Sequence, residues 1–242
     1  MAKAAFWIVD NDFYVEEAFF SARRLKEVMP EVARVLFSPM GVEDGHVFNE
    51  VYRLPRRQSK HWFVDCTRYV GEALKHLPYE LLFLDSDAYV VEPVLELFTL
   101  LERFDLALAH APGHRTAPTV NPIPDSFPEY NIGVIAMRNN GSVKHLWQSV
   151  HERQIRYTDV YQDNDQSPLR EALWDGQFPL LRWTTIPFEF NCRFTVGTYL
   201  RDRVKVLHGR ASDIDKVARD LNDQTQDRWG DVVENELEST PA

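Results

Sequence analysis

The sequence predicts a single α/β domain built on one mainly parallel central sheet, with helices on both faces. Short runs rich in β-branched and aromatic residues alternate with stretches of helical periodicity. The strand-like runs are apolar without interruption, as strands buried on both faces are. A chain of 242 residues allows one large domain or two small ones, and no linker or internal repeat divides it. We expect residues 1–222 to form the domain and 223–242 a polar, acidic tail.

The elements follow in a regular order. AAFWIV at 4–9 predicts a buried strand, and 13–29 predicts a helix that Pro30 ends. The expected strands are 4–9, 32–37, 47–54, 80–84, 105–110, 131–137, 182–187 and 204–207, and the expected helices are 13–29, 60–76, 93–104, 142–157 and 166–174. Residues 111–130 hold five prolines and predict a long functional loop.

Composition restricts the partners and the compartment. The formal net charge of −10 argues against nucleic acid and anionic membranes, which need surplus Lys and Arg. No stretch has the length of a membrane span or signal peptide. The two cysteines, Cys66 and Cys192, favour reduced thiols over a disulfide framework. We expect a cytoplasmic protein with no integral membrane segment.

Asp85 and Asp87 follow the most strand-like run of the chain, in FLDSDAYVVEP. Adjacent like charges raise the energy of a fold unless a positive group lies between them. Three interpretations are open: a solvated Asp-Ser-Asp turn, an aspartyl phosphatase, and a site for Mn²⁺ or Mg²⁺. The late position of the pair and Tyr89 two residues on argue against the phosphatase. His208, after another short strand, is either structural or a third metal ligand.

Five segments, in order, resemble GT-A glycosyltransferases of the glycogenin-like and lipopolysaccharide-galactosyltransferase group (family 8-like). They are VDNDFYVEEAFFSARRL, FLDSDAYVVEP, EYNIGVIAMR, DNDQSPL and VLHGR. The resemblance implies a GT-A, Rossmann-like domain in which Asp85, Asp87 and His208 bind Mn²⁺ or Mg²⁺. It also implies a nucleoside-diphosphate sugar as donor, with UDP favoured over GDP, and a hydroxyl-bearing acceptor. The group's Lys-Pro-Trp after the histidine is missing, and Arg210 is the nearest cation.

The resemblance places further residues at the donor. Asp10, Asn11 and Tyr14 belong to the loop that holds the base, although Tyr14 fits the helix core equally well. The alternative for Asp85 is a contact to the ribose or sugar, with Asp87 as the main metal ligand, and Ser86 and Arg210 are further candidates for donor contacts. Lys60 and Arg68 are candidates for a phosphate or sugar hydroxyl, with a solvated helix face as the alternative.

The resemblance also implies the catalytic residues. Asn131 would hydrogen-bond the donor sugar, with Gly133 giving room for close approach; the alternative is a strand-start asparagine. Asp165 and Gln166 would face the sugar and its anomeric carbon, and Asp165 is also a plausible helix cap.

Other segments are candidates for the edges of the site. Asn191 and Arg193 are expected as supporting or acceptor contacts, and Asp163 adds negative charge next to Asp165. The loop around His114 and Arg115 is expected to close over the donor.

The implied outcome is transfer with retention, either through a carboxylate nucleophile or by front-side attack. The alternatives are a phosphohydrolase, a nucleotidyltransferase and a noncatalytic nucleotide-sugar-binding module.

Overall fold

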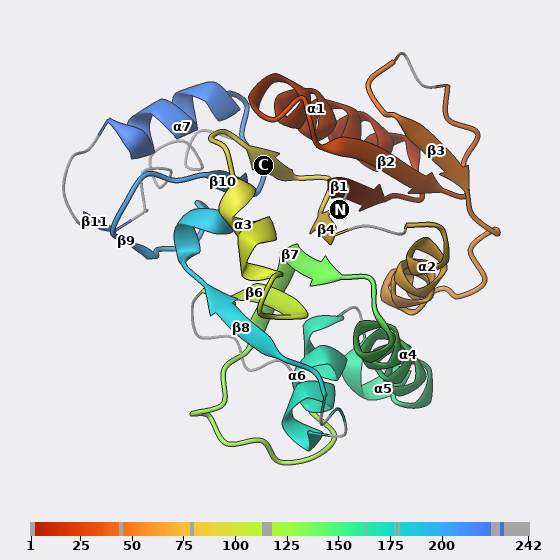
Figure 1. Ribbon diagram of the computed structural model, residues 1–242. Helices are drawn as coiled ribbons and strands as arrows, with labels where there is room; N and C mark the ends of the chain where they lie inside the picture. The colour runs from red at the N-terminus through yellow and green to blue at the C-terminus, as the bar shows by residue number, and fades with distance from the viewer. Residues whose placement is uncertain are drawn as a thin grey trace, which may run out of the picture.

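The computed structural model describes residues 3–43, 46–77, 80–112, 118–162, 164–176, 178, 180–223 and 228–229. A seven-stranded sheet forms its centre, in the order β3-β2-β1-β4-β7-β6-β8 (Figure 1). Its strands are β1 (Lys3–Ile8), β2 (Ala33–Ser38), β3 (Glu50–Arg53), β4 (Glu80–Leu84), β6 (Leu106–His110), β7 (Tyr130–Arg138) and β8 (Trp183–Ile186). Strand β7 runs antiparallel to both its neighbours, and the other neighbouring strands pair in parallel. The predicted α/β fold with a mainly parallel sheet is confirmed.

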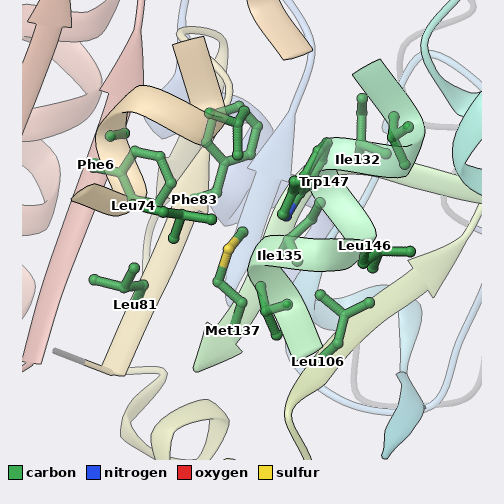
Figure 2. Packing of buried hydrophobic residues seen from close by; sticks show 14 of the residues in the cluster. Phe6, Leu74, Leu81, Phe83, Leu106, Ile132, Ile135, Met137, Leu146 and Trp147 are labelled. Atoms are coloured by element: carbon green, nitrogen blue, oxygen red, sulfur yellow. The ribbon is translucent and has the colours of Figure 1, made fainter. Parts of the chain in front are cut away.

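Helices cover both faces of this sheet. Helices α1 (Asp12–Val28) and α3 (Leu95–Leu100) pack on one face, and α2 (Trp62–His76), α4 (Gly141–Arg156) and α6 (Gln166–Asp175) pack on the other. Figure 2 shows the core between the sheet and helices α2, α4 and α6, to which Phe83 of β4, Met137 of β7 and Trp147 of α4 belong.

Strand β1 illustrates why the strands read as continuous apolar runs. Phe6 and Ile8 belong to the core under α2, whereas Ala5 and Trp7 belong to the core under α1. Because successive side chains point to opposite faces, a strand buried on both faces has no polar position. The apolar pattern therefore predicts β1 to within a residue at each end.

A smaller region beside the sheet was not predicted from the sequence as a unit. Strand β5 (Ala88–Val90) pairs antiparallel with β10 (Val206–His208), and α7 (Ile214–Asn222) packs on this pair in a third core. The region also contains η1 (Phe188–Phe190), β9 (Tyr199–Leu200) and β11 (Arg228–Trp229), and α5 (Thr158–Tyr161) follows α4 elsewhere in the fold.

The remaining predictions concern the two cysteines, membrane-spanning segments and the C-terminal tail. Both cysteines are buried, and neither forms a disulfide within the described residues, in agreement with the expectation of reduced thiols. Each helix of the described residues is too short or too polar to cross a lipid bilayer. The predicted tail lies outside the described residues except for Asp223 and 228–229, and we propose that the domain ends with α7.

Candidate active site

Asp85 and Asp87 lie directly after β4, at the carboxyl end of a central strand, where α/β sheets bind their ligands. The Asp85 amide donates to the Gly133 carbonyl of β7 (2.9 Å), and the Ala88 amide donates to the Asp85 carbonyl (3.0 Å). The backbone thus turns tightly from β4 into β5, as the turn interpretation required. The turn is not solvated at Asp87, because this residue is only 7% exposed.

Pairing of β5 with β10 brings a histidine to the two aspartates. His208 lies opposite Ala88, and the Gly209 amide donates to the Asp87 carbonyl (2.9 Å). Nε2 of His208 lies 3.5 Å from an oxygen of Asp85 and 3.5 Å from an oxygen of Asp87. One ligand atom from each of the three residues falls within 4.8 Å of the others. Two carboxylates and an imidazole at this spacing fit a single Mn²⁺ or Mg²⁺ ion.

The charges at this cluster depend on one another. Burial raises the pKa of Asp87, but His208, Arg210 and Arg193 together bring it below its ordinary value. Burial lowers the pKa of His208, but the Asp85 and Asp87 carboxylates outweigh burial and raise it above its ordinary value. The cluster therefore favours a positive charge between the two aspartates.

Two adjoining cavities open at this cluster. We call the first, of about 230 Å³, the aromatic cavity; its lining includes Ile8, Tyr14, Trp62, Cys66, Ser86, Asp87 and Arg210. We call the second, of about 190 Å³, the amide cavity; its lining includes Asn131, Gly133, Asn164 and Gln166. Both are also lined by Phe63, Asp85, Asp165, Arg193 and His208. The predicted metal ligands therefore lie at or beside the boundary of two different environments.

Arg210 lies at the rim of the aromatic cavity. Its guanidinium forms two hydrogen bonds with Glu17 (2.5 and 2.9 Å) and lies 3.5 Å from a carboxylate oxygen of Asp87. It also lies over the ring of Tyr14, at 5.7 Å, and Ser86 donates to the Glu17 carboxylate (2.9 Å). The contact with Glu17 contributes most to raising the pKa of Arg210, so this side chain stays charged next to Ser86 and Asp87.

Four predicted donor contacts lie away from both linings in the part of the chain that the structure describes. Asp10 pairs with Arg57 (3.1 Å), and the Asn11 side chain caps α1 by accepting from the Tyr14 amide (3.1 Å). Arg68 pairs with Asp65 on its own helix. Lys60 is exposed. The aromatic lining instead contains Trp62 and Phe63, which the sequence did not single out because aromatic residues at a helix start are usually core.

The amide cavity changes two expectations about its residues. The room left by Gly133 is filled by His208, because a Cβ atom at residue 133 would lie 2.0 Å from Cε1 of that imidazole. Asp165 makes no capping hydrogen bond to α6; instead Asn164 accepts from the Ser167 amide (2.9 Å). Burial and the nearby Asp85 carboxylate raise the pKa of Asp165 well above its ordinary value.

An irregularity in β7 shapes this cavity. The pairing of β6 with β7 jumps between Leu108 and Ala109, so that Leu108 faces Ile135 and Ala109 faces Asn131. The β7 residues in between leave the ladder with β6, as residues of a bulge do. The Gly133 amide then donates to the side chain of Asn131 (3.0 Å). Asp163, His114 and Arg115 lie outside the described residues.

Comparison with solved structures assigns the fold. No protein-family model and no curated protein sequence matches the chain. The glycosyltransferase GlyE of Streptococcus pneumoniae TIGR4 aligns with a TM-score of 0.62 at 14% identity, over 88% of this chain and 55% of that chain. The galactosyltransferase LgtC, in complex with donor and acceptor sugar analogues, aligns with a TM-score of 0.59 at 16% identity, over 89% of this chain and 91% of that chain. The chain has the GT-A fold. An active-site mutant of LgtC aligns similarly, with a TM-score of 0.58 at 14% identity, over 92% and 84% of the two chains.

Proposed function

We propose that the protein is a metal-dependent glycosyltransferase that moves a hexose from a nucleoside-diphosphate sugar to a hydroxyl-bearing acceptor, with retention of configuration. A UDP-sugar is the favoured donor and a GDP-sugar the second candidate. The observation that supports this most strongly is the meeting of Asp85, Asp87 and His208 at the end of a central strand, in a fold shared with glycosyltransferases.

We propose Asp85, Asp87 and His208 as ligands of one Mn²⁺ or Mg²⁺ ion. A bound divalent cation neutralises the negative charge that develops on the departing diphosphate. Arg210 lies 3.5 Å from the Asp87 carboxylate, so it supplies a second positive charge for the same phosphates. Ser86, next to Arg210 in the lining, would contribute a hydroxyl.

The two cavities suit the two ends of such a donor. The base would stack in the aromatic cavity, against Tyr14 or Trp62. The hexose would lie in the amide cavity, where Asn131 and Gln166 offer donors and acceptors to its hydroxyls. Asp165 lines both cavities, so we place it nearest to the bond that breaks.

The alternatives fit this geometry less well. A nucleotidyltransferase needs a glycine-rich, basic loop after the first strand, whereas β1 is followed by Val-Asp-Asn-Asp. A phosphohydrolase of the aspartyl type usually has its acidic pair after the first strand, whereas Asp85 and Asp87 follow β4. The cytoplasmic location stays a prediction from the sequence.

Consumption of the donor tests the proposal directly. Proton NMR would follow the anomeric signals of UDP- and GDP-hexoses with Mn²⁺ and a panel of saccharide acceptors. We expect loss of one donor, release of the nucleoside diphosphate and a product with the anomeric configuration of the donor. Release of inorganic phosphate from monoesters would establish the phosphohydrolase instead, and donor binding without consumption under every condition would establish the binding module.

A further inference from the structure

A continuous chain of side-chain hydrogen bonds runs from His208 along the amide cavity. Nδ1 of His208 lies 2.8 Å from Oδ1 of Asn191, and Nδ2 of Asn191 donates to Oδ1 of Asn131 (2.8 Å). Nδ2 of Asn131 donates to Oε1 of Gln166 (3.3 Å), and Nε2 of Gln166 donates to Oε1 of Glu129 (3.2 Å). These residues come from β10, the end of η1, β7, α6 and the position before β7. The hydrogen bonds therefore connect three separate parts of the fold, at η1, β7 and α6, to one imidazole.

The direction of this chain is fixed at three independent points. The Glu129 carboxylate only accepts, so the amide nitrogen of Gln166 must face it. The Gly133 backbone amide only donates, and it lies 3.0 Å from Oδ1 of Asn131. Arg193 also only donates, and its Nη1 lies 3.1 Å from Nε2 of His208. All three groups agree with one orientation, in which each amide side chain points its nitrogen toward Glu129 and its oxygen toward His208.

This direction selects one tautomer of the neutral imidazole. Nδ1 carries the proton because Asn191 presents its oxygen there. Nε2 then keeps its lone pair, and it is Nε2 that lies 3.5 Å from both Asp85 and Asp87. A histidine binds a metal ion through its unprotonated nitrogen, and the partner of the other nitrogen decides which one that is.

Burial makes the opposite orientation costly. Asn191 is 0% exposed and His208 is 1% exposed, so an inverted amide would leave a buried donor facing a buried donor. Gly133 lies directly against the ring, which opposes rotation of the imidazole out of this position. The contacts at Nδ1 therefore favour the Nδ1–H tautomer, against the Asp85 and Asp87 carboxylates, which lie 3.5 Å from Nε2 and favour a proton there until a cation replaces it.

We infer that Asn191, Asn131, Gln166 and Glu129 are positioning residues that present Nε2 of His208 to the metal, so that side chains in the wall of the amide cavity and directly behind it control metal affinity. The inference rests on the proposed function for the presence of the cation. It extends that function because it links Glu129, at the far end of the hydrogen-bond chain, to the metal ligand His208. Glu129 has no described hydrogen bond to Asp85 or Asp87.

The tautomer can be read in metal-free protein by ¹⁵N–¹H correlation spectra of labelled histidine. The measurement is made as a series of rising pH that continues until the imidazole signal no longer changes, and His208→Gln identifies the signal among the eight histidines. We expect the Nδ1–H tautomer in the wild-type protein. The Nε2–H tautomer as the main form would overturn the inference.

Three variants then test the chain of contacts by titration with Mn²⁺. Asn191→Leu removes the acceptor from Nδ1, and we expect Mn²⁺ affinity to fall by about 10- to 100-fold. Asn191→Asp keeps an acceptor at Nδ1, so it should retain the Nδ1–H tautomer and most of the affinity. Glu129→Gln replaces a group that only accepts with one that does both, and we expect affinity to fall by about threefold. Its matched control is Glu152→Gln, an exposed glutamate on α4.

The outcomes separate this inference from the proposed function. Unchanged Mn²⁺ affinity in Asn191→Leu would overturn the role of the chain, and unchanged affinity in Glu129→Gln would overturn the role of Glu129. Far-ultraviolet circular dichroism shows that each variant folds. A protein with the Nδ1–H tautomer and the expected affinities, yet without donor consumption, would keep the inference and contradict the glycosyltransferase.

Discussion

The two cavities beside the metal-ligand cluster are held together in different ways. The rim of the aromatic cavity depends on a charged side chain with substantial exposure: Arg210 is 51% exposed where it pairs with Glu17. The wall of the amide cavity depends on hydrogen bonds between amide side chains, anchored on Asn191, which lies behind the wall at 0% exposure. Exposed ion pairs contribute little to stability and change partners easily, whereas buried amide networks specify one geometry.

This difference indicates what each cavity can tolerate. Arg210 can leave Glu17 for the phosphates of a ligand at small cost, so the aromatic side adapts to the donor. The amide side cannot rearrange without leaving buried polar groups unpaired. We therefore expect changes at the amides around His208 to affect the metal most, and changes at Arg210, on the aromatic side, to affect mainly the nucleotide.

The largest effect is expected from Gly133→Ala. Its Cβ atom would lie 2.0 Å from Cε1 of His208, so the imidazole must move away from Asp85 and Asp87. We expect Mn²⁺ affinity to fall by about 10- to 100-fold and the free energy of unfolding to fall by about 1–3 kcal/mol. Isothermal titration calorimetry and urea denaturation measure the two quantities.

The matched control for that variant is Gly71→Ala on α2, where nothing lies within 4 Å of the added Cβ atom. It should leave Mn²⁺ affinity unchanged. Wild-type affinity in Gly133→Ala would show that the position of His208 does not govern the metal.

A second effect concerns pH. The carboxylates of Asp85 and Asp87 raise the pKa of His208 above its ordinary value of 6.5, and a protonated Nε2 cannot bind a cation. Affinity for Mn²⁺ should be constant above this raised pKa and fall by about tenfold per pH unit below it. Titrations from pH 9 to pH 5 measure the change; a constant affinity over the whole range would contradict histidine ligation.

The smallest effects are expected at basic residues near the aromatic cavity. Arg210→Ala should weaken binding of UDP in the presence of Mn²⁺ by about tenfold, as expected for the loss of one charge-assisted contact. Lys60→Ala should leave binding unchanged, because Lys60 is exposed and lies outside the described linings. Equal losses in the two variants would show that nonspecific charge, and not the position of Arg210, holds the diphosphate.

The sequence predicts the parts of this molecule that local pattern determines. The strand before Asp85 is a continuous apolar run, and the aspartates follow at its end, so the sheet edge that they share could be inferred without coordinates. His208 was singled out because it follows another short strand-like run, and the resemblance then implied that it binds the metal. The main helices were found because Pro30 and the spacing of apolar residues mark them.

The rest depends on contacts between distant segments. The register of β5 with β10 brings His208 to Asp87, but both strands have three residues and too little pattern to specify a register. Glu129 is an ordinary polar residue in sequence, and only the fold shows that three amide side chains join it to the His208 imidazole. Arg68 was a candidate for a donor contact, but its side chain pairs with Asp65 on its own helix. Which partner Arg68 takes depends on how α2 packs, and the sequence does not show this.

The most direct test of the central claim is the binding of UDP, measured by calorimetry with and without Mn²⁺, in the wild-type protein and in Asp87→Asn. The substitution keeps the size of the side chain and removes one charged ligand from the cluster. We predict that tight binding of UDP to the wild-type protein requires Mn²⁺, and that the requirement and the affinity are both lost in Asp87→Asn. Equal binding of UDP in all four conditions would contradict a metal-dependent donor site at Asp85, Asp87 and His208.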